Sequence, residues 1–214
     1  MHVALIPDGN RRFAKKNGMS YNDLLKHWVD KGFEGMRRLL DEGIPEKYKD
    51  IVDEIKEASV YVASNENLKR DDGSGGMVPE LIIRLHKMYL NRSEYFTETE
   101  LDTLESYVDN VCVKFVGDKK GVSMQVQEIL NEIEDKTQYG KHLVSVAFNY
   151  NYKNDLEGKY PRNQSNIDVI LRPGGEKRLS GFFPRESTYA ELIFLDKLFP
   201  ELTEDDIVAA HEDY

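Results

Sequence analysis

Three short polar segments each follow a predicted strand, and two of them combine acids, arginines and glycines in a way that suits a phosphate-bearing ligand. They read DGNRR at 8–12, SNEN at 64–67 and RPGGEKRLS at 172–180. Guanidinium groups bind phosphate oxygens through two parallel hydrogen bonds, and glycines let backbone amides approach an anion closely. The first segment also begins a predicted helix, where free N–H groups favour anions. The first and third segments therefore each offer part of an anion site.

Each of these features also has a simpler interpretation. Asp8 could be the N-cap of a helix with Arg11 and Arg12 in solvent, and the third segment could be a charged surface hairpin. A divalent cation that bridges a diphosphate prefers carboxylate oxygens, and Asp8 with Glu191 is the candidate pair. This pair requires the two side chains to be close in the fold, and Glu191 taken alone is more often an ordinary charged residue.

The composition excludes several classes of protein. The 214 residues carry 29 Lys and Arg against 39 Asp and Glu, and the net charge of -10 argues against a nucleic-acid partner. The single cysteine, Cys112, excludes an internal disulfide and fits a reducing compartment. The sequence has no P-loop, no GxSxG elbow and no HExxH zinc motif. No apolar run approaches a membrane span, so a cytoplasmic protein is expected, with peripheral membrane contact left open.

The elements that must position these segments alternate along the chain. Short apolar runs ending in turn residues predict six strands, at 2–6, 59–63, 111–116, 143–148, 168–171 and 192–194. Apolar spacing of three and four predicts helices at 22–40, 46–56, 78–89, 99–108 and 122–133, and a last helix after Thr203. We therefore expect one α/β domain over 1–214, with a mainly parallel six-stranded sheet and helices on both faces. The three segments follow strands, so they should gather at one edge of the sheet.

The three segments, followed by YAEL at 189–192, resemble the motifs of the cis-prenyltransferases in order and content. These are the undecaprenyl and dehydrodolichyl diphosphate synthases, and the pair Arg11-Arg12 is more similar to the archaeal and eukaryotic branch. The resemblance implies a six-stranded parallel sheet ringed by helices, with an apolar tunnel. It also implies condensation of isopentenyl diphosphate onto farnesyl or geranylgeranyl diphosphate, giving a long polyprenyl diphosphate with new cis double bonds for a glycosyl-carrier lipid.

The resemblance also implies a role for each motif residue. Asp8 would hold Mg²⁺ with help from Glu191, and Asn10 and Ser64 would lie near the reacting carbons. The positions implied to bind substrate are Gly9, Arg11, Arg12, Phe13, Glu66, Asn67, Arg70, Arg172, Arg178 and Ser180. The helix at 78–89 is expected to line the tunnel, with ordinary core packing as the alternative.

The sequence departs from the family pattern in several places. Phe13 and Leu68 stand where the family usually has Trp, and the segment from Asn149 to Asp168 is short. The Arg-x-Gly tail that crosses a dimer in many members is not found after His211. We expect a homodimer, with a heteromer as the alternative. A non-catalytic partner subunit of a heteromeric synthase is the rival function, and a generic anion-binding or phosphohydrolase domain is the third. Product length is not determined by the sequence.

Overall fold

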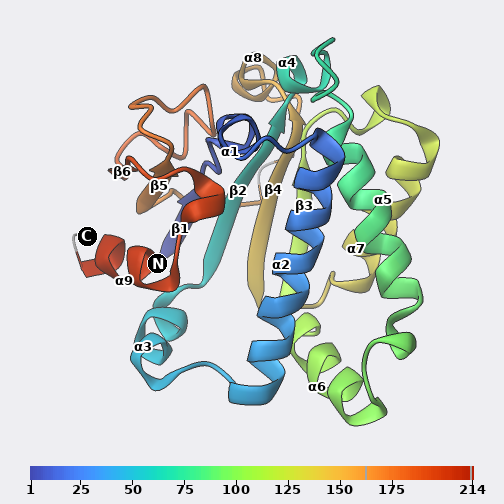
Figure 1. The fold of residues 1–214 in the computed structure, drawn as a ribbon. Helices are drawn as coiled ribbons and strands as arrows, with labels where there is room; N and C mark the ends of the chain where they lie inside the picture. The colour runs from blue at the N-terminus through green and yellow to red at the C-terminus, as the bar shows by residue number, and fades with distance from the viewer. Residues whose placement is uncertain (162, 213) are drawn as a thin grey trace.

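A single six-stranded sheet forms the centre of the computed structural model, which describes residues 1–161, 163–212 and 214 (Figure 1). Every neighbouring pair of strands runs parallel, in the order β3-β4-β2-β1-β5-β6. The strands are β1 (His2–Leu5), β2 (Glu57–Ser64), β3 (Val111–Val116), β4 (His142–Tyr150), β5 (Val169–Pro173) and β6 (Glu191–Leu195). The predicted fold class and all six predicted strands are confirmed.

The predicted helices are found close to their expected positions. The helices are α1 (Asn10–Lys16), α2 (Tyr21–Glu42), α3 (Glu46–Glu54), α4 (Asn65–Leu68), α5 (Met77–Leu90), α6 (Glu98–Val108), α7 (Met124–Lys136), α8 (Tyr152–Leu156) and α9 (Glu204–Glu212). Two short helices, α4 and α8, were not predicted. A capping box begins α9, because Thr203 Oγ1 accepts from the Asp206 amide at 3.4 Å and Asp206 accepts from the Thr203 amide at 2.8 Å. None of the helices in the described part of the chain combines the length and apolar character needed to cross a bilayer.

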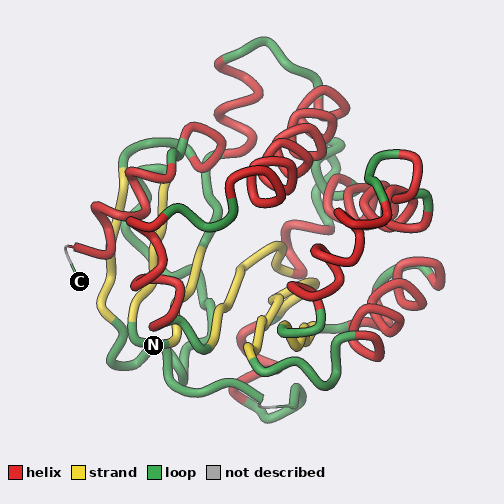
Figure 2. Tube along the Cα trace, turned by 90° about the horizontal axis from the view of Figure 1, so that it is seen from below, coloured by secondary structure: helices red, strands yellow, loops and turns green. Residues whose placement is uncertain are grey.

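The two faces of the sheet are covered differently. On one face, residues of α5 and α7 pack against Ala63 and Phe148, and Figure 2 shows helices gathered along this side of the strands. On the other face, Phe182 and Phe183 from the β5–β6 connection close the core. That connection contains three glycines and Pro184, which disfavour a helix, so a loop rather than a helix packs on the core here.

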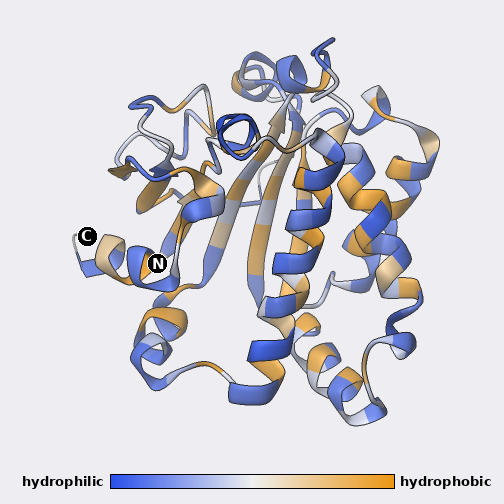
Figure 3. Cartoon of the chain, viewed as in Figure 1, coloured by the Kyte–Doolittle hydropathy of each residue, from blue (hydrophilic) through white to orange (hydrophobic). Residues whose placement is uncertain are grey.

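Hydropathy follows this layering. The strands are largely apolar, whereas the outward side of α2 is hydrophilic (Figure 3). Burial of apolar side chains between sheet and helices therefore fixes the register of the strands. In that register Leu5 of β1 lies between Val60 of β2 and Leu171 of β5. The carboxyl ends of β1, β2 and β5 are thus neighbours, and the three predicted segments meet at one edge, as expected.

Candidate active site

Asp8 lies immediately beyond β1 and is the centre of a charged cluster. Its Oδ1 accepts a hydrogen bond from the Gly9 amide at 2.7 Å and lies 3.3 Å from Arg12 Nη2. Its Oδ2 accepts from Arg172 Nη2 at 2.7 Å. The N-cap of α1 is Gly9 and makes no side-chain cap, so the interpretation of Asp8 as an ordinary N-cap is wrong.

Arg172, at the end of β5, is almost fully buried, with 3% of its surface exposed. Besides Asp8, its guanidinium group donates to Ser180 Oγ at 2.9 Å and to the Arg178 carbonyl. Its Nε is buried and has no partner among the described residues. A surface hairpin would leave this arginine in water, so that interpretation of the third segment is also wrong.

The loop that carries Ser180 is wound in an uncommon backbone conformation. Ser180 has φ 54° and Phe183 has φ 36°. Residues other than glycine rarely adopt this left-handed region of backbone conformation. Such positions cost on the order of 1–3 kcal/mol each and persist where surrounding contacts determine them. The two hydrogen bonds from Arg172 supply such contacts, and they aim the Ser180 hydroxyl at the charged cluster.

Gly174 is where the third segment passes closest to the first. Arg12 Nη1 donates to the Gly174 carbonyl at 2.7 Å, and Gly174 has φ 97°. A Cβ atom at this position would lie 2.8 Å from Arg12 Nη2 and 3.2 Å from the Asp8 backbone. A glycine is therefore required by both the conformation and the contact.

Replacing Gly174 with alanine is expected to lower the free energy of unfolding by about 1–3 kcal/mol, because the new methyl group is strained and displaces Arg12. Urea denaturation measures this change. Gly35→Ala is the matched control, since a Cβ at Gly35 in α2 meets nothing within 4 Å and alanine favours a helix. An unchanged stability in Gly174→Ala would contradict the close approach.

The pKa of Asp8 is held below its usual value. Partial burial acts to raise this pKa, but the hydrogen bonds from Arg172 and Gly9, together with the charges of Arg172 and Arg12, outweigh burial. The carboxylate is therefore ionised at neutral pH and remains so into mildly acidic solution.

This shift predicts how Asp8 contributes to stability at low pH. The pKa is lower in the folded than in the unfolded chain, so the stabilisation is present above about pH 4 and is lost as the pH falls through the folded value. We expect the difference in unfolding free energy between wild type and Asp8→Asn to be constant from pH 7 to 5 and to shrink below pH 4. Urea denaturation at pH 7, 5, 4 and 3 measures it. A difference that persists unchanged at pH 3 would show that the charge is not its source.

Ser64 and Asn67 form the start of α4 at the end of β2. Ser64 Oγ accepts from the Asn67 amide at 3.0 Å, and Asn67 Oδ1 accepts from the Ser64 amide at 3.2 Å. This reciprocal capping makes the segment after β2 a helical turn. Glu66 is exposed in that turn. The structure therefore gives Ser64 and Asn67 a structural role beside the site.

Arg11 and Arg70 lie on the outer side of the cluster. Arg11 Nη1 donates to Asp72 Oδ2 at 2.9 Å, and about half of each side chain is exposed. Burial, and then the nearby charge of Arg11, lower the pKa of Arg70, whereas Asp72 and Asp8 oppose this. These interactions place the segment after α4 against α1, with Arg70 close to the acids and arginines of the site.

Asn10 and Phe13 both lie on α1 but make different contacts. Asn10 Nδ2 donates to the Pro7 carbonyl at 2.8 Å, and its Oδ1 is buried without a partner among the described residues. Phe13 packs against the His27 ring with centroids 5.3 Å apart. Asn10 thus offers an unused acceptor at the cluster, while Phe13 helps to fix α1 on α2.

Glu191 is not brought to Asp8 by the fold. It is the first residue of β6 and lies beside Val169, which in turn lies beside Val3 of β1. Val3 is three residues before Ile6, about 10 Å along a strand, and Asp8 lies beyond the other end of β1. The expected pairing of Asp8 with Glu191 within one chain is therefore wrong, because Glu191 begins a strand of the parallel sheet whereas Asp8 follows the end of one.

Tyr61 is a polar residue at this edge that the sequence analysis did not single out. Its hydroxyl donates to the Ser180 carbonyl at 3.4 Å, and its ring stacks on Phe182 with centroids 5.0 Å apart. Burial raises the pKa of Tyr61 to about 12, although a hydrogen bond with Ser64 opposes this rise. Its position near the end of a predicted strand was the only signal in the sequence.

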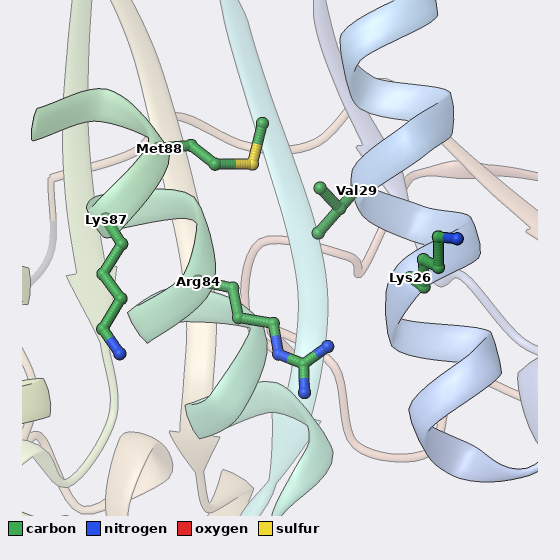
Figure 4. A pocket seen from close by; sticks show the side chains of 5 residues that line it. All are labelled: Lys26, Val29, Arg84, Lys87 and Met88. Carbon is green, nitrogen blue, oxygen red and sulfur yellow. The ribbon is translucent and has the colours of Figure 1, made fainter. Parts of the chain in front are cut away.

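A cavity of about 250 Å³ lies between α2 and α5. Val29 of α2 and Met88 of α5 point toward each other across it (Figure 4). Its lining residues are Lys26, Val29, Arg84, Lys87 and Met88. Of the expected tunnel wall, Val78 and Ile82 pack against the core instead, and Tyr89 is partly exposed.

Comparison with known proteins agrees with the arrangement of these motifs. The family model described as "Putative undecaprenyl diphosphate synthase" matches residues 6–162 and 157–214. The tritrans,polycis-undecaprenyl-diphosphate synthase (geranylgeranyl-diphosphate specific) of Pyrobaculum aerophilum is 30% identical, covering 100% of this chain and 92% of the relative. The isoprenyl transferase of Treponema denticola is 28% identical over 100% of this chain and 93% of its own length.

Two solved structures share the fold. Lavandulyl diphosphate synthase from Lavandula x intermedia, in complex with dimethylallyl diphosphate, has a TM-score of 0.66 at 21% identity, covering 100% of this chain and 94% of its own. A probable undecaprenyl diphosphate synthase from Campylobacter jejuni has a TM-score of 0.59 at 24% identity, covering 99% and 93%. With a family model matching nearly the whole sequence, the chain belongs to the cis-prenyltransferase (undecaprenyl diphosphate synthase) family.

Proposed function

We propose that this chain is an Mg²⁺-dependent cis-prenyltransferase that adds isopentenyl diphosphate to an allylic diphosphate. The observation that carries this proposal is the cluster of Asp8, Arg12 and Arg172 where the ends of β1 and β5 meet. In such a reaction negative charge develops on the departing diphosphate. Preorganised cations and hydrogen-bond donors at that point lower the barrier more than they stabilise the bound substrate.

Each of the two diphosphates would be bound by its own group of residues. Gly9, Asn10 and Arg12 would bind the allylic diphosphate, and Arg172, Arg178 and Ser180 would bind isopentenyl diphosphate. The buried Arg172 Nε and Asn10 Oδ1, which lack partners among the described residues, support a ligand or its bound water here. Ser64 and Asn10 would lie beside the reacting carbons, and Glu66, Asn67 and Arg70 would border the entrance.

Asp8 would hold the Mg²⁺ ion. A carboxylate is the hard oxygen ligand that this ion prefers, and Mg²⁺ is usually bound through one or two carboxylates, substrate phosphates and water. No group of three or more metal-binding side chains occurs in the described chain, so substrate oxygens and water would complete the coordination. The ion would neutralise charge on the leaving diphosphate.

The apolar part of the substrate needs apolar side chains to pack against, and the candidate place is the cavity between α2 and α5, where Val29 and Met88 face each other (Figure 4). We propose farnesyl or geranylgeranyl diphosphate as the starter, since the Pyrobaculum relative is named as geranylgeranyl-diphosphate specific. The product would be a long polyprenyl diphosphate that serves as a glycosyl-carrier lipid. We further propose that residues 1–214 act as one unit in the cytoplasm, with peripheral membrane contact when the product is released.

The two edge strands support a proposal about assembly. On β3 the amides of Val113 and Phe115 donate to Thr137 Oγ1 at 3.0 Å and Glu134 Oε1 at 2.7 Å, so α7 protects that edge. Comparable side-chain acceptors on the β6 edge are absent from the described residues, and Leu192 of β6 is 43% exposed. We propose that the chain forms a homodimer through β6, with a heteromer as the alternative.

Incubation with labelled isopentenyl diphosphate, Mg²⁺ and each starter, followed by organic extraction, tests the activity. We expect label in the extract with farnesyl or geranylgeranyl diphosphate, and none after chelation. Diphosphate release without extractable label would favour a phosphohydrolase. Absence of turnover until a second chain is added would favour the partner-subunit alternative.

A further inference from the structure

A second cavity, of about 690 Å³, lies at the far side of the sheet beyond the carboxyl end of β3. Four lysines line it, with two acids: Lys114, Lys119, Lys120, Lys159, Asp118 and Glu134. The chain as a whole carries a net charge of -10, so a concave site with an excess of lysines is unusual within it. Two strands, β4 and β2, separate β3 from β1, which leads into Asp8.

The charges of this lysine cavity do not cancel internally. Lys119 Nζ lies 2.5 Å from Glu134 Oε2. The other carboxylate oxygen, Glu134 Oε1, accepts a hydrogen bond from the Phe115 amide. Asp118 Oδ1 accepts from the Lys120 amide at 3.1 Å. Among the described residues, Lys114 and Lys120 have no ion-pair partner. Two ammonium groups therefore remain available to an anion.

The loop that presents Lys119 and Lys120 is rigidly held. Gly117 has φ 151°, and a Cβ there would lie 1.9 Å from the Phe148 carbonyl oxygen. The Asp118 amide donates to the Asn149 carbonyl at 3.1 Å, and Asn149 Nδ2 donates back to the Asp118 carbonyl at 2.8 Å. A loop fixed in this way loses little conformational entropy when a ligand binds.

The same asparagine connects the lysine cavity to the candidate active site. Asn149 is 1% exposed and has φ 50°, and its Oδ1 accepts from Asn65 Nδ2 at 2.9 Å. Asn65 is the first residue of α4, next to Ser64. One buried side chain thus bonds both to the loop before Lys119 and to the helical turn beside the site.

We propose that the lysine cavity binds a small polyphosphate anion and that Asn149 couples its occupancy to α4. Lysine ammonium groups bind phosphates as point charges, and the volume falls in the range of small-molecule sites. The anion has two sources that share this chemistry: inorganic diphosphate and a nucleoside triphosphate.

Amide NMR of the whole chain, titrated separately with inorganic diphosphate and ATP in metal-free buffer at low salt, tests the proposal. We expect the amides of Lys119, Lys120 and Gly121 to shift with a saturable curve. The double variant Lys114→Gln/Lys120→Gln should weaken this binding at least tenfold. The control Lys31→Gln/Lys49→Gln removes the same charge from α2 and α3, and should change it less than twofold. ATP binding at least tenfold tighter than diphosphate would identify the nucleotide as the source, and the reverse order would identify diphosphate.

Shifts at Gly9 and Gly174 report the candidate active site separately, so binding there is not confused with binding in the lysine cavity. We expect the Asn65 amide to shift together with Lys120 in wild type and to lose that response in the double variant. The proposed site would be overturned if the amides of Lys119, Lys120 and Gly121 did not shift at 10 mM of either anion. It would also be overturned if the double variant and its control bound the anion with equal affinity. A silent Asn65 amide at saturation would overturn the coupling.

Discussion

Replacing Asp8 with asparagine is expected to lower kcat/KM for chain elongation by about 10²–10⁴-fold. Asparagine keeps the size of the side chain but removes the negative charge that faces Arg12 and Arg172 and that, in the proposed function, would hold Mg²⁺. With that charge gone, the two guanidinium groups also lose the partner that orients them. The measurement is steady-state incorporation of labelled isopentenyl diphosphate at saturating Mg²⁺.

The matched control for this variant is Asp30→Asn, an exposed position on α2. It removes the same charge and should leave kcat/KM within twofold of wild type. Urea denaturation of Asp8→Asn at pH 7 verifies that the variant is folded under the assay conditions. A folded Asp8→Asn protein with near wild-type turnover would remove Asp8 from the centre of the site.

Replacing Arg172 with glutamine is expected to reduce both stability and activity. Arg172 is buried and bonds to Asp8, to Ser180 and to the Arg178 carbonyl, so its loss leaves several polar groups unsatisfied. Breaking a fully buried pair costs about 3–5 kcal/mol, and the partial exposure of Asp8 reduces this to about 2–4 kcal/mol. Urea denaturation and the elongation assay measure the two effects.

Two further variants separate these effects. Arg178→Gln changes an exposed arginine and should alter the unfolding free energy by less than about 0.5 kcal/mol while still weakening diphosphate binding. Arg172→Lys keeps the charge but loses the two-pronged geometry, so it should not restore activity. Wild-type stability in Arg172→Gln would contradict the bonding described for this side chain.

The fold and one edge of the site could be predicted because local patterns determine them. Short apolar runs fixed the strands, and the turn residues after β1, β2 and β5 marked the edge where ligands bind in parallel sheets. Asp8 and Arg172 are 164 positions apart in the sequence, yet they meet because each follows a strand of the same sheet.

Other features depend on the register of the strands and on the direction of single side chains. The spacing of apolar residues in the sequence predicts neither. Glu191 was expected beside Asp8, but it is the first residue of β6 and therefore lies at the opposite end of the parallel sheet. The capping of α4 by Ser64 and the link from Asn65 to Asn149 require contacts between distant or irregular segments. Nothing in the sequence distinguished Tyr61 from the other residues of its strand. Its hydroxyl reaches the site only because the β5–β6 loop brings the Ser180 carbonyl to it.

The central claim is that this chain builds a polyprenyl diphosphate with cis double bonds. The most direct test is carbon NMR of the extracted product made from an all-trans starter and ¹³C-labelled isopentenyl diphosphate, which assigns the geometry of each newly formed double bond. The account predicts that every labelled unit is cis and that the product is missing from the Asp8→Asn reaction. Newly added trans units, or a starter recovered without added units in the presence of Mg²⁺ and any required partner, would contradict it.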